Sequence, residues 1–132
     1  MSYFEDVKDF HAKVLGNPDF LSDPTIFVQR IEFLSEELLE LHNAMAANDY
    51  VGIADALADL VYVALGTADI LQLPFDDVWK LVHDANMRKV KGETKRGNRF
   101  DAMKPPGWQS PEPFIEEAIL RHADKLARDA AN

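Results

Sequence analysis

The feature that most constrains the fold is a long apolar segment that acidic residues interrupt. Residues 51–73 are rich in Ala, Leu and Val, but Asp55, Asp59 and Asp69 lie among them. A charge near the centre of a membrane costs about 2.5–3.5 kcal/mol on insertion scales, so three of them exclude a simple membrane-spanning helix. A helix that is apolar nearly all round is expected to be buried by neighbours on several sides. The segment therefore predicts the central helix of a soluble bundle.

The rest of the chain also reads as helical, with no convincing strand. Apolar residues recur at three- and four-residue spacing, which places them on one face of a helix. A turn at Asn48 and Asp49 separates the second helix from the third, and a loop of about twenty residues, long enough to suggest a function, precedes the last helix. We predict an all-α fold, a bundle of about five helices in one domain spanning residues 1–132. The expected helices are Tyr3 to Val14, Thr25 to about Ala47, Tyr50 to Leu71, Asp76 or Asp77 to about Val90, and Pro113 to about Ala130.

Charge and composition narrow the function. The formal net charge is −9, which argues against nucleic-acid binding because such proteins neutralise phosphates with Lys and Arg. The chain has no cysteine and no basic-then-apolar leader, which fits a cytoplasmic protein that binds neither membrane nor nucleic acid. Half of the fourteen basic residues nevertheless fall in residues 88–104, so this stretch carries a local excess of positive charge. They are Arg88, Lys89, Lys91, Lys95, Arg96, Arg99 and Lys104.

Three glutamates share one face of the second predicted helix. Glu36, Glu37 and Glu40 span about 100° of its circumference, because each residue advances about 100°. Glu37 also follows Leu34 by three residues and precedes Leu41 by four, so it abuts the apolar stripe of Phe27, Ile31, Leu34, Leu38, Leu41 and Met45. An unpaired anion there is costly unless its pKa rises or a positive charge compensates it.

Two aspartates lie one turn apart on the central helix. Asp55 and Asp59 are surrounded by apolar residues, and an antiparallel pairing of the two helices would bring them to the glutamates. Mg²⁺ or Mn²⁺ prefers such oxygen ligands, and two ions could polarise a phosphate and leave one glutamate as general base. A lone acidic cluster is more often a solvated helix face, and Asp59 could instead pair with Arg30. An iron-carboxylate bundle is set aside because no histidine follows a glutamate by three residues.

Polar residues downstream could complete a phosphate site. Asn86 and Lys89 continue the inward stripe of Val78, Val82 and Ala85 on the fourth helix, and Lys104 precedes a proline pair in the long loop. The alternative for Lys89 is a favourable interaction with a helix C-terminus, and for Lys104 an ordinary solvated lysine. Trp79 and Trp108 are more often core residues than base-stacking platforms, and neither is assigned to the site.

In this order, the motifs EELLE, DALADLVYVALGTA, HDANMRKV and KPPGW resemble the all-α nucleoside triphosphate pyrophosphohydrolases of the MazG-like superfamily, in particular its small phage and bacterial members and its phosphoribosyl-ATP pyrophosphohydrolase-like branch. The likeness extends from about Phe10 to Pro113. It implies hydrolysis of a nucleoside or deoxynucleoside triphosphate to the monophosphate and pyrophosphate, with two or three Mg²⁺ or Mn²⁺ ions. It also implies an obligate oligomer, a homodimer or homotetramer.

The resemblance assigns roles to individual residues. It makes Glu36, Glu37 and Glu40 the first metal motif and Asp59 the aspartate of the second, with Glu36 and Glu37 also catalytic. Where many members carry a glutamate three residues before this aspartate, the chain has Ala56, and Asp55 is expected to substitute. Asn86, Lys89 and Lys104 are the expected substrate-binding residues. Phosphoribosyl-ATP hydrolysis and a non-catalytic helical assembly module are the alternatives.

Overall fold

The structure is a computed structural model that describes residues 1–92 and 101–132. In these ranges the chain forms five α-helices, so the predicted all-α class and helix number are confirmed. The chain divides into two compact units, Met1–Phe75 and Asp76–Asn132. Organisation as a single domain stays a prediction. The helices are α1 (Tyr3–Lys13), α2 (Ile26–Ala46), α3 (Tyr50–Ile70), α4 (Phe75–Met87) and α5 (Glu112–Ala131), and a 3₁₀ turn covers Phe20–Ser22.

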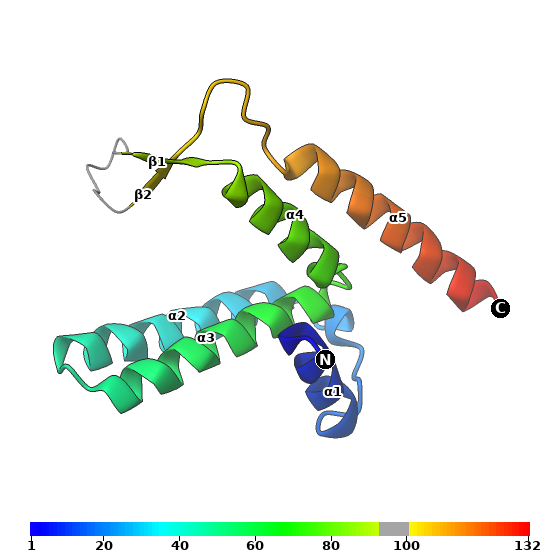
Figure 1. Cartoon of the computed structure of the whole chain (residues 1–132). Helices are drawn as coiled ribbons and strands as arrows, with labels where there is room; N and C mark the ends of the chain where they lie inside the picture. Colours follow the sequence, from blue (N-terminus) through cyan, green and yellow to red (C-terminus); the bar gives the residue numbers. More distant parts are fainter. Residues whose placement is uncertain (93–100) are drawn as a thin grey trace. The chain divides into compact units, whose positions relative to one another are not determined.

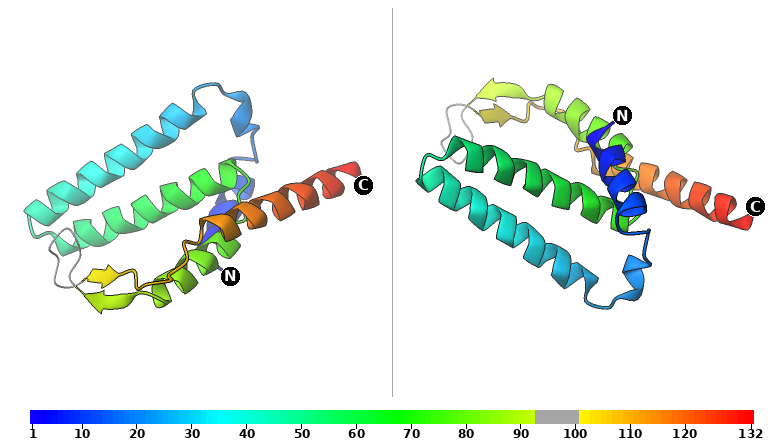
Figure 2. Two further views of the ribbon diagram at one scale, coloured as in Figure 1. Left: turned by 90° about the horizontal axis from the view of Figure 1, so that it is seen from above. Right: turned by 90° about the horizontal axis from the view of Figure 1, so that it is seen from below.

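The first unit is built around α2 and α3, which lie side by side and run antiparallel (Figures 1 and 2). The predicted turn joins them: Asn48 takes a positive φ of 52°, and the Asp49 side chain caps α3 by accepting a hydrogen bond from the Gly52 amide at 3.0 Å. A positive φ is tolerated better by Asn than by most residues, and Asp is among the best N-caps. This tight connection is what brings the acidic stretches of the two helices together.

Helix α1 packs against the C-terminal half of α3 and forms the small core of the unit. Phe4 and Val7 from α1 meet Leu65 and Ala68 from α3. His11, which is 3% exposed, joins this contact because its Nδ1 lies 2.6 Å from Oδ2 of Asp69. A buried polar side chain needs such a partner, so the pair fixes α1 on α3 at this end.

The side chains of α2 that face α3 differ from the predicted stripe. The less exposed positions of α2 are Ile26, Gln29, Arg30, Leu34, Glu37, Leu41 and Ala44. Leu34 and Leu41 were predicted correctly, but Phe27 and Ile31 are both 64% exposed, and Leu38 and Met45 are exposed as well. Helix α2 therefore has two apolar faces, and α3 covers only one of them.

Within the first unit, neighbours cover only part of the central helix, and its burial on several sides stays a prediction. Within the first unit α3 packs against α1 and α2, while Val51, Leu57 and Val61 are exposed. Among the described residues α3 is also the one helix long and apolar enough to cross a membrane by length and composition, with a mean hydropathy of 1.5. The contacts with α1 and α2 account for only part of its apolar surface.

The second unit contains two strands, so the prediction of no strand is wrong. Strand β1 (Val90–Gly92) pairs antiparallel with β2 (Asp101–Met103), and Val90 lies opposite Met103. Strands of three residues are too short to show a two-residue periodicity in the sequence. Lys95, Arg96 and Arg99 of the predicted basic stretch lie outside the described residues.

Candidate metal centre

Three of the five predicted metal ligands converge between α2 and α3. Glu37 and Glu40 from α2 and Asp59 from α3 each offer a carboxylate oxygen, and these oxygens lie within 4.8 Å of one another. Glu37 and Asp59 are half-buried, while Glu40 is exposed at the edge of the group. We call Glu37, Glu40 and Asp59 the carboxylate triad.

Helix geometry explains why these residues meet. Glu37 lies between Leu34 and Leu41 on the face of α2 that packs on α3, as its spacing predicted. Asp59 is three residues after Ala56, which is 2% exposed and belongs to the face of α3 that is covered. The packed faces of the two helices therefore bring carboxylates from both into one space.

In residues 1–92 and 101–132, no positive side chain forms an ion pair with the triad. Among the described residues, Oε2 of Glu37 is buried and has no hydrogen-bond partner. Burial raises the pKa of Glu37 above its usual value, and the charges of Glu40 and Asp59 raise it further. Carboxylates held together in this way disfavour ionisation unless a cation joins them.

Arg30, which could have paired with Asp59, is engaged elsewhere. Its Nη2 donates to the carbonyl of Val63 at 2.9 Å, and its Nε donates to Oγ1 of Thr67 at 3.0 Å. In the described part of the chain, the ion pairs are His11 with Asp69 and Lys13 with Asp9, and neither involves the triad. The simple explanation of Asp59 as a salt-bridge partner of Arg30 is therefore wrong.

The triad fits a divalent cation with hard-ligand preference. Its donors are all carboxylate oxygens, one of them buried without a partner, which matches the oxygen coordination of Mg²⁺ and Mn²⁺. Glu36 and Asp55 are exposed and stand outside the triad, although the charge of Glu36 contributes to the raised pKa of Glu37. The assignment of Glu36 and Asp55 as ligands stays a prediction.

The predicted substrate-binding residues belong to the second unit. Asn86 is exposed near the end of α4, and Lys89 is the second residue after that helix. The ammonium nitrogens of Lys89 and Lys104 lie 5.3 Å and 5.0 Å from the centre of the Trp108 ring. Trp108 was not predicted to belong to the site, although the KPPGW motif contains it.

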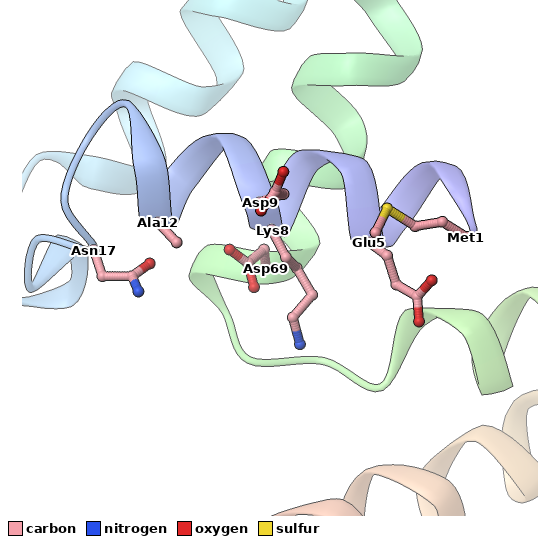
Figure 3. Close-up of a pocket in the computed structure, with 7 residues that line it drawn as sticks. All are labelled: Met1, Glu5, Lys8, Asp9, Ala12, Asn17 and Asp69. Carbon is pink, nitrogen blue, oxygen red and sulfur yellow. The ribbon is translucent and has the colours of Figure 1, made fainter.

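A separate open hollow of about 490 Å³ lies beside α1 (Figure 3). It is lined by Met1, Glu5, Lys8, Asp9, Ala12, Asn17 and Asp69, and it includes no member of the triad. Asp69 is already bound to His11, and Lys8 contacts the ring of Phe4. The hollow is thus a surface depression whose charged groups serve the packing of α1.

Comparison with known proteins gives one family. The sequence model of the family described as phosphoribosyl-ATP pyrophosphohydrolase matches residues 7–86, which include all of α2 and α3 and the complete triad. Searches of curated proteins and of solved structures returned no match. The family lies within the MazG-like all-α superfamily, and its members are typically metal-dependent hydrolases that release pyrophosphate from a nucleotide-like substrate. Because the match covers more than half of the sequence, the chain belongs to the phosphoribosyl-ATP pyrophosphohydrolase family.

Proposed function

We propose that the chain hydrolyses a nucleoside or deoxynucleoside triphosphate to the monophosphate and pyrophosphate, with Mg²⁺ or Mn²⁺ as cofactor. The observation that carries the proposal is the carboxylate triad, whose oxygens lie within 4.8 Å of one another with no cation from the described residues to balance them. Family membership supports the reaction type. A role in controlling or cleaning a cytoplasmic nucleotide pool follows from this activity.

We assign metal binding, proton transfer and phosphate binding to different residues. Glu37, Glu40 and Asp59 would hold the ions, with Asp55 one turn before Asp59 as a further ligand. Bound ions would neutralise phosphate oxygens and lower the pKa of a coordinated water. Glu36 is exposed on the same turn as Glu37 and outside the triad, so its carboxylate is available to accept the proton of the attacking water. Asn86, Lys89 and Lys104 are proposed to bind the phosphates, which stabilises charge on the leaving pyrophosphate.

Self-association is part of the proposal. The uncovered face of α2 carries Phe27, Ile31, Leu38 and Met45, and α3 exposes Val51 and Val61. Large apolar side chains that are exposed at helical spacing on α2 are the basis of an interaction site. A second copy of the chain is the partner that supplies matching apolar faces, giving a dimer or a tetramer.

Two other functions predict different results. Phosphoribosyl-ATP is favoured as substrate by the description of the matching family, and a non-catalytic assembly module would hydrolyse nothing. A panel of common and noncanonical triphosphates and phosphoribosyl-ATP, assayed for pyrophosphate with Mg²⁺ and with Mn²⁺, separates them. Preference for a triphosphate supports the proposal, and preference for phosphoribosyl-ATP makes that compound the substrate instead. Absence of pyrophosphate release with either metal refutes both enzymatic functions.

A further inference from the structure

We infer that Trp108 is a positioning residue, which gathers Lys89 and Lys104 into a clamp for the pyrophosphate portion of the substrate. The inference deepens the proposed function and rests on it for the identity of the ligand. Its evidence lies entirely within the second unit, in the contacts of one aromatic ring.

The hairpin brings the two lysines together first. Strands β1 and β2 pair Val90 with Met103, so the next position along the same register places Lys89 opposite Lys104. Lysines far apart in the sequence thereby become neighbours at the open end of the strand pair. Like charges in facing positions repel each other, so this arrangement needs a compensating interaction.

Trp108 supplies part of that compensation. The ammonium groups of Lys89 and Lys104 lie 5.3 Å and 5.0 Å from its ring centre, within the range of cation–π attraction. Neither lysine forms an ion pair with another residue of the described ranges. Two positive groups that contact one ring and have no ion pair within the described ranges form a site that an anion with several charged oxygens would complete.

The ring itself is held in place. Indole Nε1 of Trp108 donates to the carbonyl of Ala85 at 2.7 Å, and Ala85 is 1% exposed. The backbone before it is a tight turn, with the Trp108 amide bonded to the carbonyl of Pro105 at 3.0 Å and Gly107 at a φ of +81°, which favours glycine. The platform is thus anchored to α4 on one side and to a rigid turn on the other.

Fluorescence tests the clamp without catalysis. The chain has two tryptophans, and Trp79 is 64% exposed on α4, so Trp79→Phe leaves Trp108 as the single indole emitter. Inorganic pyrophosphate is titrated into this variant without divalent metal, which keeps the carboxylate triad out of the measurement. We expect a saturable change in emission that sodium chloride of equal ionic strength does not produce. A response identical to that of chloride overturns the inference.

The lysine variants in the same background define the clamp. Lys89→Gln and Lys104→Gln keep most of the side-chain length and remove the charge, so each should weaken pyrophosphate binding by about two- to fivefold, the value of one exposed ion pair with a phosphate oxygen. Unchanged affinity in both variants contradicts a clamp. If emission responds but no triphosphate is hydrolysed, the clamp stands and the proposed function fails.

Turnover kinetics distinguish a positioning role of Trp108 from a purely structural role. Trp108→Leu should raise KM for the triphosphate by about five- to twentyfold with kcat nearly unchanged. It removes the cation–π contacts that hold Lys89 and Lys104 in place. Trp108→Phe keeps a ring and should rescue part of the loss, and Trp79→Phe should match the unaltered protein. If Trp108→Leu fails to fold, the titration of the Trp79→Phe protein still decides. A fall in kcat with unchanged KM would overturn the inference.

Discussion

Glu37 on α2 and Asp59 on α3 place carboxylate oxygens within 4.8 Å of each other across two antiparallel helices, and the triad is completed by Glu40. Two anions do not approach each other in a half-buried space without cost. The first unit accepts this cost where α2 packs on α3, which is what the metal site of the proposed function would require.

Glu37→Gln should reduce turnover at least about hundredfold, because it removes one ligand charge and the oxygen that is buried without a partner. The amide keeps the shape of the side chain, so the helices should stay folded. Initial rates of pyrophosphate release with saturating Mg²⁺ measure the effect. Glu32→Gln is the matched control, since Glu32 is exposed on the same helix and outside the triad. Equal rates in the two variants would exclude Glu37 from the site.

Without metal, the melting temperature of the protein should fall as pH rises. Added Mg²⁺ should oppose this fall, because it stabilises the protein more at high pH than at low pH. The folded-state pKa of Glu37 is raised from 4.5 by burial and like charges, so the folded protein binds this proton more tightly than the unfolded chain. Without metal, the favourable contribution is complete below the ordinary glutamate pKa and is lost as pH rises through the raised value. Melting temperature of metal-free protein should therefore fall with rising pH over this window more steeply than in Glu37→Gln.

Addition of Mg²⁺ supplies the second half of that test. Binding requires deprotonated carboxylates, so the rise in melting temperature on adding Mg²⁺ should be larger at pH 8 than at pH 5. Glu37→Gln should lose most of this rise, while Glu32→Gln should keep it. A metal-induced rise that is the same at both pH values would count against coordination by the triad.

The sequence predicts which face of a helix a site residue occupies, but it does not predict which residues of two packed helices meet. Glu37 was predicted to face α3 because helical spacing between Leu34 and Leu41 fixes its side. The choice between Asp55 and Asp59 depends on how far α2 slides along α3, since the two aspartates differ by about 6 Å along the axis. Helical periodicity carries no information on that register.

The uncovered faces and the Trp108 contacts escaped prediction for other reasons. Apolar residues at helical spacing do not reveal whether the covering surface comes from the same chain or from another copy, and α2 carries two such faces. Trp108 meets Lys89 only because three-residue strands pair across a hairpin, and so short a pairing leaves no periodic signal.

Two ion pairs on α1 should differ in their effect on stability. Asp69→Asn replaces the partner of buried His11, and loss of a hydrogen bond with a charged acceptor should cost about 1.5–3 kcal/mol of unfolding free energy. Asp9→Asn breaks the exposed pair with Lys13 and should cost no more than about 0.5 kcal/mol. Urea unfolding of metal-free protein measures both. The kcat of folded Asp69→Asn should be unchanged, and a large loss would place this pair in the active site.

Charges introduced on the exposed apolar faces of α2 and α3 should weaken the proposed self-association. Ile31 and Val51 are 64% and 83% exposed in the single chain, and burial of such a side chain stabilises an interface by about 1.5–3 kcal/mol. Ile31→Glu or Val51→Glu should therefore raise the dissociation constant by at least about tenfold. Size-exclusion chromatography with light scattering over a dilution series measures this dissociation constant.

Leu120→Glu on α5, where the leucine is 58% exposed, is the matched control and should leave the assembly intact. A monomeric unaltered protein would refute self-association, whereas dissociation by Leu120→Glu alone would move the interface from α2 and α3 to α5.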